Sequence, residues 1–112
     1  MTILEIKSEA EYLEISNNAP ASLFYFSHDD CNVCKVLKPK VHELLQEKYP
    51  KIPMYYVNIH KSSKISGQRS IFAVPTILVY MDSQEIIRKS RNIGLAELDE
   101  LIAKPYSLLF DQ

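Results

Sequence analysis

Glycine is scarce in this sequence, long apolar runs are absent, and neither sign of charge is in excess. The two glycines among 112 residues leave the chain few flexible loops. No apolar run approaches the roughly 18 residues that a membrane-spanning helix requires. The formal net charge of −1 gives no basis for binding nucleic acid or an anionic membrane. With 46% hydrophobic and 24% charged residues, the composition is typical of a single globular domain, 1–112, which we expect to be a soluble monomer.

The first twenty residues lack the cationic and apolar segments of a secretory signal peptide. They carry Glu5, Glu9, Glu11 and Glu14 instead. We therefore expect a cytoplasmic protein. In that compartment an isolated pair of cysteines is more often catalytic or metal-binding than a structural disulfide.

Cysteine is scarce as well, and the only two cysteines are Cys31 and Cys34. An apolar stretch, 21–27, precedes them and is typical of a buried strand, and a helical pattern follows them to about Lys48. Cys31 is therefore expected at or just before the first helical turn, where free N–H groups and the helix dipole stabilise an anion. This position favours a nucleophilic thiolate at Cys31, and Cys34 should lie on the same helix face, more deeply covered.

A pair with this spacing can serve as half of a metal site or as a dithiol/disulfide couple. A metal site would need two more ligands, and the nearby candidates are His28, His60, Asp29 and Asp30. The chain has no second Cys-x-x-Cys motif and no closely spaced histidine pair. We therefore favour the redox couple and expect no metal and no cofactor beyond the cysteines themselves.

Hydrophobic periodicity predicts strands that alternate with helices. The predicted strands cover 2–6, 21–27, 52–59, 77–81 and 85–93, and the predicted helices begin after Ser8, after Cys31, within 60–70 and at Leu95. Ser8 and Glu11 have the spacing of a capping box. The resulting order, β-α-β-α-β-α-β-β-α, predicts an α/β domain with a mixed central sheet and helices on both faces.

Two prolines affect the helical patterns. Pro39 falls inside the helix that follows the cysteines, and because the periodicity resumes after it, we expect a kink rather than an end. The last helix should stop before Pro105, with the apolar tail 106–112 packed on the body. The residues expected to face the core are Ala10, Tyr12, Leu13 and Ile15 in the first helix and Val33, Val36, Leu37, Val41, Leu44 and Leu45 in the second. The residues expected in the core or the wall of the site are Tyr55, Tyr56, Phe72 and Tyr80.

Several of these features together resemble the thioredoxin family, over nearly the whole chain. The residues that carry the resemblance are Cys31, Cys34, Lys35, Pro39 and the segment Val74-Pro75-Thr76. The cysteine spacing alone is a weak signal, but its combination with the kinking proline, the Val-Pro-Thr segment before a strand and the element order is specific. The resemblance implies a thioredoxin-like fold and a thiol–disulfide oxidoreductase, in which Cys31 is the nucleophile and Cys34 the resolving thiol.

The resemblance also implies that the Val74–Pro75 peptide bond is cis. In such a fold this loop would lie against the cysteine pair, and the backbone N–H and C=O of Val74 would pair with an extended segment of the substrate. Pro75 offers no N–H that would compete, and Thr76 would support the loop. These three residues are therefore expected to shape the substrate-binding groove.

The chain departs from the family's pattern at several positions. Asp30 stands before the first cysteine, where tryptophan is common, and Asn32-Val33 replaces Gly-Pro between the cysteines. Tyr25 occupies the place of a buried aspartate, and Tyr56 that of the lysine which partners it. Because a phenol, with a pKa of ~10, is a poor base at neutral pH, we expect slow resolution of the mixed disulfide or a route through water.

The charges around Cys31 nearly balance. Asp29 and Asp30 destabilise a thiolate there, and one exposed charge about 6 Å away contributes roughly 0.7 kcal/mol. Lys35 and the helix terminus stabilise the thiolate, and the terminus contributes about 0.3–1 kcal/mol. A thiolate no more stabilised than in ordinary thioredoxins makes a reducing couple. We therefore predict a reductant of protein disulfides that takes electrons from a thioredoxin reductase or a low-molecular-weight thiol. The alternative, favoured by the tyrosines and the acidic turn, is a thioredoxin-like binding module or redox-regulated switch without efficient turnover.

Overall fold

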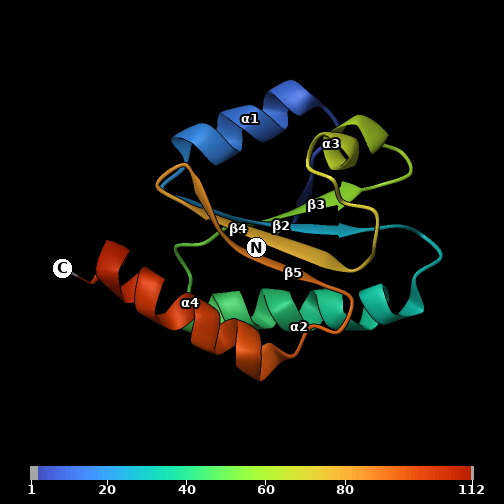
Figure 1. Ribbon diagram of the computed structural model, residues 1–112. Helices are drawn as coiled ribbons and strands as arrows, with labels where there is room; N and C mark the ends of the chain where they lie inside the picture. Colours follow the sequence, from blue (N-terminus) through green and yellow to red (C-terminus); the bar gives the residue numbers. More distant parts are fainter. Residues whose placement is uncertain (1–2, 112) are drawn as a thin grey trace.

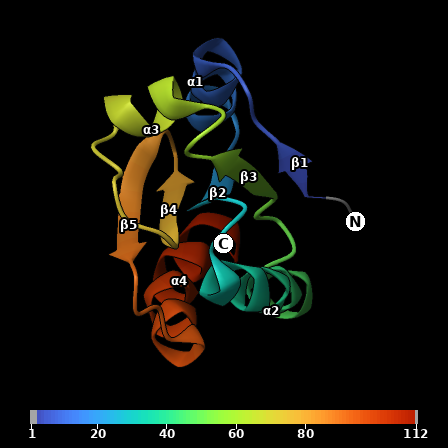
Figure 2. The same cartoon turned by 90° about the vertical axis from the view of Figure 1, so that its right-hand side faces the viewer.

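The computed structural model describes residues 3–111 and contains a mixed, five-stranded sheet between two layers of helices (Figure 1). The strands are β1 (Leu4–Glu5), β2 (Ala21–Ser27), β3 (Met54–Asn58), β4 (Thr76–Met81) and β5 (Gln84–Ser90), and the helices are α1 (Glu9–Asn18), α2 (Asn32–Lys48), α3 (Ser63–Gln68) and α4 (Leu95–Phe110). Helices α1 and α3 cover one face of the sheet, and α2 and α4 cover the other (Figure 2). The predicted α/β class and element order are confirmed, and Thr2 of the first predicted strand lies outside the described residues.

Strand β2 lies at the centre of the sheet, which has the order β1-β3-β2-β4-β5, and all of its residues are buried. It pairs in parallel with β3 and antiparallel with β4. Because side chains alternate along a strand, Phe24 and Phe26 belong to the core cluster on the α1 side, and Leu23 and Tyr25 to the cluster that includes α2 and α4. Tyr25 is thereby directed at the helix that carries the second cysteine.

The predicted core face of α1 is partly wrong. Tyr12 is fully buried as predicted, but Ala10 and Leu13 are exposed, and Ser16 is buried in their place. The Tyr12 ring packs on Phe24 with a centroid distance of 4.0 Å. Ser16 follows one turn later on the same row and is small enough to let the helix lie close to the sheet.

Helix α2 passes through Pro39 and ends at Lys48, as predicted. Its buried residues are Cys34, Leu37, Val41 and Leu45. Val33 and Val36, which were predicted to face the core, are 65% and 59% exposed. Each precedes a buried residue by one position, which is about 100° around the helix axis. The helix therefore leaves two aliphatic side chains uncovered beside the cysteine pair.

The helix ends agree with the prediction at α1 and contradict it at α4. The Ser8 side chain caps α1 by accepting a hydrogen bond from the Glu11 N–H at 3.1 Å. Helix α4 does not stop before Pro105 but continues to Phe110. Pro105 removes one backbone donor, and the packing of buried Tyr106 on Tyr49, with ring centroids 5.0 Å apart, favours continuing the helix. No helix among residues 3–111 is long and apolar enough to cross a membrane.

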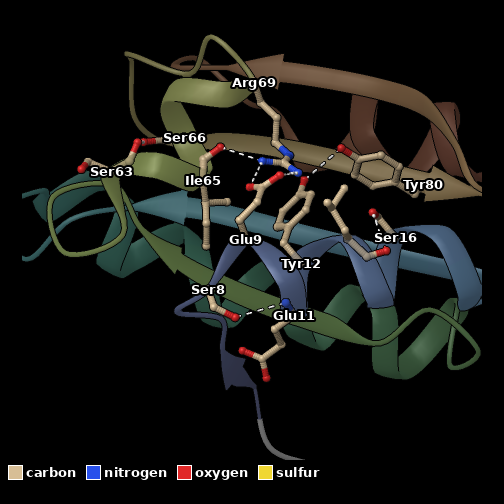
Figure 3. A network of polar contacts seen from close by, with 11 residues as sticks. Ser8, Glu9, Glu11, Tyr12, Ser16, Ser63, Ile65, Ser66, Arg69 and Tyr80 are labelled. Carbon is tan, nitrogen blue, oxygen red and sulfur yellow. Dashed lines mark hydrogen bonds and ion pairs between the residues drawn. The ribbon is translucent and has the colours of Figure 1, made fainter.

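A partly buried polar cluster ties α1, α3 and β4 together on the face of the sheet opposite the cysteines (Figure 3). The Arg69 guanidinium binds both carboxylate oxygens of Glu9, at 2.7 and 3.0 Å, and donates to the Ile65 carbonyl at 2.9 Å. It also lies over the Tyr12 ring, 3.7 Å from the centroid. The Tyr12 hydroxyl in turn donates to the Tyr80 hydroxyl at 3.0 Å. These contacts fix the two helices of this layer on the sheet.

Arg69→Gln should lower the free energy of unfolding by about 1–3 kcal/mol, because it leaves a partly buried carboxylate without its partner. Urea denaturation measures the loss. The control is Lys61→Gln, which removes an ion pair with Asp29 whose side chains are 69% and 71% exposed and should therefore cost less than about 1 kcal/mol. Equal losses in the two variants would contradict the role assigned to Arg69.

Candidate active site

Cys31 caps the N-terminus of α2, immediately after the turn that leaves β2. Its sulfur accepts a hydrogen bond from the Cys34 N–H at 3.2 Å. Cys34 is 1% exposed, Cys31 is only partly covered, and the two are joined as a disulfide with Cα atoms 5.2 Å apart. The expected position of Cys31 at the helix start and the deeper burial of Cys34 are both observed. The pair thus has one sulfur within reach of a second molecule and one enclosed sulfur.

The predicted substrate loop lies at the same end of the sheet as the cysteine turn. Thr76 is paired with Phe26, so Pro75 lies beside the point where β2 ends and the cysteine turn begins. The Val74–Pro75 peptide bond is cis. Val74 and Cys31 are both partly buried and pack against the same core cluster. The structure therefore brings the loop and the cysteines together.

Hydrogen bonds hold this loop in place. The Thr76 hydroxyl donates to the Ala73 carbonyl at 2.6 Å and lies 2.9 Å from the Ser90 hydroxyl. The Arg91 N–H donates to the Pro75 carbonyl at 2.7 Å. Phe72, which was expected in the core or the site wall, is not in the core, because its side chain is 80% exposed. It stands in solvent just before the loop.

Tyr25 contacts the helix at the second cysteine. It is fully buried, and its hydroxyl donates to the Cys34 carbonyl at 2.7 Å. Burial, and to a lesser extent the neighbouring Tyr56, raise the pKa of Tyr25 well above its ordinary value. The phenol therefore remains protonated at neutral pH, and its hydrogen is directed at a carbonyl. This geometry makes Tyr25 a positioning residue rather than a base.

Tyr25→Phe should cost about 1 kcal/mol of stability, because the buried Cys34 carbonyl loses one donor. The pH dependence of turnover should not change between about pH 6 and about pH 9, because the phenol titrates above that range in the folded protein. Rate profiles of the two proteins across that range check this. The matched control is Tyr56→Phe, because the Tyr56 hydroxyl lies 3.3 Å from the Ser27 hydroxyl and, within residues 3–111, makes no hydrogen bond to either cysteine. The loss of an ionisation from the profile of Tyr25→Phe alone would show that Tyr25 does act as a base.

A hollow of about 230 Å³ opens beside the enclosed sulfur, and its lining includes Cys34, Tyr56, Lys38 and His28. The Lys38 ammonium lies over the Tyr56 ring, 4.1 Å from its centroid. Lys38 was not identified from the sequence, although it follows Cys34 by four residues and so lies on the same helix face. The hollow therefore brings Lys38 and Tyr56 to the same surface depression as the second cysteine.

The acidic turn before Cys31 is partly neutralised. Asp29 lies 3.7 Å from the Lys61 ammonium. The Asp30 N–H donates to Nδ1 of His28 at 3.2 Å, and its side chain is exposed. The His28 ring stacks on His60 with centroids 4.4 Å apart. Lys35 is exposed on the first turn of α2, and of the two aspartates only Asp29 has a cationic partner within residues 3–111.

The described part of the chain contains no group of side chains that would form the alternative metal site. Among residues 3–111, no three His, Cys, Asp or Glu side chains are placed to hold one ion. A pair of sulfurs that can form and break a bond with each other can store and release two electrons. In this pair the Cys31 sulfur is the one accessible to another protein. This is the arrangement needed for thiol–disulfide exchange.

The comparison with known sequences gives the same class. The sequence pattern of the Thioredoxin family matches residues 3–104, and the chain belongs to this family. The protein is a protein-disulfide oxidoreductase with a Cys-x-x-Cys pair at its centre.

Curated relatives and solved structures show the same likeness. The chain is 28% identical over 87 residues to the thioredoxin-like protein YdfQ of Bacillus subtilis, covering 78% of this chain and 77% of that one. It is 32% identical over 80 residues to a thioredoxin of Chlamydia trachomatis, covering 71% and 74%. The crystal structure of oxidised thioredoxin O2 from Arabidopsis thaliana superposes with a TM-score of 0.80 at 26% identity, covering 93% and 94% of the two chains.

Proposed function

We propose that this protein reduces disulfide bonds of cytosolic proteins, with Cys31 as the attacking thiol and Cys34 as the resolving thiol. The observation that carries the proposal is the contrast between the two sulfurs. The Cys31 sulfur is accessible and accepts the Cys34 N–H at 3.2 Å, whereas Cys34 is 1% exposed. A sulfur that receives an N–H at a helix start is the better thiolate, and thiolates are the nucleophiles of disulfide exchange.

The reaction runs in two exchanges. The Cys31 thiolate attacks one sulfur of the substrate disulfide, a mixed disulfide forms, and the other substrate sulfur leaves as a thiolate that takes up a proton. Cys34 then loses its proton and attacks the Cys31 sulfur. The Cys31–Cys34 disulfide forms, and the second substrate sulfur leaves. The substrate gains two electrons and two protons, and the described structure corresponds to the oxidised protein that results.

The direction of electron flow follows from the balance of charge around Cys31. The helix start and Lys35 stabilise its thiolate, and the exposed carboxylate of Asp30 opposes them. Asp29 adds little, because Lys61 lies 3.7 Å from it. A strong oxidant needs an unusually stable reduced form, and these modest, opposing contributions do not supply one. The pair therefore acts as a reductant.

The substrate is held by the loop of Val74, Pro75 and Thr76. An extended segment of the substrate pairs with the backbone of Val74, which leaves its disulfide over Cys31. Electrons return from a thioredoxin reductase or from a low-molecular-weight thiol, and no further cofactor takes part. A reducing compartment such as the cytosol is where such a pair is regenerated.

A second candidate function is a binding module or thiol switch that turns over slowly. The observation that favours it is Tyr25, which stands beside Cys34 as a hydrogen-bond donor and cannot accept the proton of the resolving thiol. In that case the surface around the cysteines would bind a partner without cycling.

The test is a turnover assay on a protein with accessible disulfides, with NADPH and a thioredoxin reductase, or separately glutathione, as the source of electrons. Catalytic amounts of the protein should accelerate disulfide reduction with at least one donor, for many cycles per molecule. Stoichiometric reduction that stops after one cycle with either donor would favour the switch. Tight binding of a partner that persists in Cys31→Ser would favour the module.

A further inference from the structure

A groove of about 660 Å³ lies beside the cysteine pair, between the first half of α2 and the loop that joins β5 to α4. Asn32 and Val33, the two residues between the cysteines, are part of its lining, together with later residues of α2. The groove therefore adjoins the redox centre. A segment of substrate attached to the reacting sulfur can extend into this groove.

Part of the lining of the groove is aliphatic. Val33 and Val36 are 65% and 59% exposed, although they belong to a helix that buries its other aliphatic residues wholly or in part. Ile93 of the facing loop also lines the groove and is partly buried. An aliphatic side chain placed between them would remove this apolar surface from water.

Two cationic residues also belong to the lining of the groove. Lys40 and Arg91 both line it, and within residues 3–111 neither of them makes an ion pair. Glu97, in the first turn of α4, is paired with Lys89 at 3.1 Å. Glu43, one turn along α2, makes no ion pair with Lys40. The two cations are thus available to a carboxylate from outside the chain.

The backbone at Arg91 is held in a conformation that suits glycine. Its φ is 65°, its N–H donates to the Pro75 carbonyl at 2.7 Å, and its carbonyl accepts from the Ile93 N–H at 3.1 Å. Within residues 3–111 the other non-glycine residues with positive φ, Ser70, Asp82 and Ser83, have short side chains. A long charged side chain at such a position stands against the backbone preference, and an outlier of this kind points to a role for the side chain.

We propose that this groove binds a substrate segment that carries an aliphatic residue and an acidic residue next to the disulfide, and that Arg91 and Lys40 select it by pairing with the carboxylate. The inference rests on the proposed reduction of protein disulfides and names the class of substrate. Arginine suits this role because its guanidinium pairs with both oxygens of a carboxylate.

The experiment uses two disulfide-linked peptides that are identical except for Glu or Gln beside the leucine that flanks the reactive cysteine. The wild-type protein should reduce the Glu peptide with a kcat/KM about threefold higher, the size expected for exposed ion pairs. The double variant Lys40→Gln and Arg91→Gln should bring the ratio of the two peptides close to one. The use of Gln keeps a non-glycine residue at the positive φ, and the ratio is insensitive to a general loss of folded protein.

The control variant is Lys104→Gln, which removes an exposed positive charge from α4 and should leave the ratio unchanged. Raising the salt concentration to about 1 M should reduce the wild-type ratio, because it screens exposed charges. A wild-type ratio of one, or a ratio that survives in the double variant, would overturn the assignment.

Affinity separates the failure of this inference from the failure of the proposed function. The same two peptides, with serine in place of cysteine, should bind the oxidised wild-type protein with affinities in the same ratio. If neither disulfide peptide is reduced, the proposed function fails, and the affinities still decide whether the groove selects acidic segments. Equal affinities would overturn the inference even where reduction is fast.

Discussion

Cys31→Ser should lower the rate of disulfide reduction on the order of 10³-fold or more. A serine hydroxyl is not ionised at neutral pH. The helix start stabilises a thiolate on Cys31 but is too weak to turn the serine hydroxyl into a comparable nucleophile. Cys34 cannot take over, because it is 1% exposed and enclosed by the core. The rate is measured with a small excess of protein over a disulfide substrate, so that a single exchange is observed.

The unfolding transition of this variant, compared with that of the reduced wild type, shows whether the loss is chemical. Similar stability with no measurable exchange supports the assignment. A variant that keeps more than about a tenth of the wild-type rate would show that the attack does not come from Cys31.

Cys34→Ser should keep the first exchange, which Cys31→Ser loses, but it should lose the second exchange. The Cys31 thiolate still attacks, and the mixed disulfide then persists because no neighbouring thiol resolves it. An intramolecular thiol held one turn away has a large advantage in effective concentration over any thiol in solution. We expect steady-state turnover to fall on the order of 10²-fold while the first exchange stays within about tenfold of wild type.

Mass spectrometry of the trapped species measures the result. The expected adduct joins one substrate sulfur to Cys31 and is released by an added thiol. The Cys31→Ser variant is the matched control and should form no adduct. Adducts on Cys34 in that control, or free turnover by Cys34→Ser, would contradict the order of the two thiols.

The central strand and the long helix could be predicted from the sequence because their patterns are long and regular. The predicted strand 21–27 has the same first and last residues as β2. The periodicity after Pro39 correctly predicted that α2 continues. The prediction that the last helix stops before Pro105 was also made from the local sequence, and it was wrong. What keeps α4 going is the contact of Tyr106 with Tyr49, a residue far away in the sequence, and local patterns carry no information on such a contact.

The helix faces show the same limit. Each predicted face included exposed residues, since an apolar residue was taken to be a buried one. On α2 the sheet covers a single row that includes Leu37, and Val33 and Val36 lie beside that row. Their exposure next to the cysteines is informative, because it is one of the observations behind the proposed substrate groove.

The site divides in the same way. The cysteine pair and the loop of Pro75 are carried by short segments, and the sequence placed them correctly in the fold. Lys38 and Arg91 were not identified, because the hollow beside Cys34 and the groove beside α2 are each assembled from separate elements. The positive φ of Arg91 also cannot be recognised from an arginine, which gives no sign of the backbone conformation that a glycine would have indicated.

The most direct measurement is the midpoint potential of the Cys31–Cys34 pair, obtained by equilibrating the protein with a series of thiol–disulfide buffers and quantifying the free cysteines. Because the Cys31 thiolate receives only modest net stabilisation, the potential should lie near the ~−270 mV of thioredoxin. A potential near ~−120 mV, that of the strongest protein oxidants, would contradict the proposal that this pair donates electrons to protein disulfides.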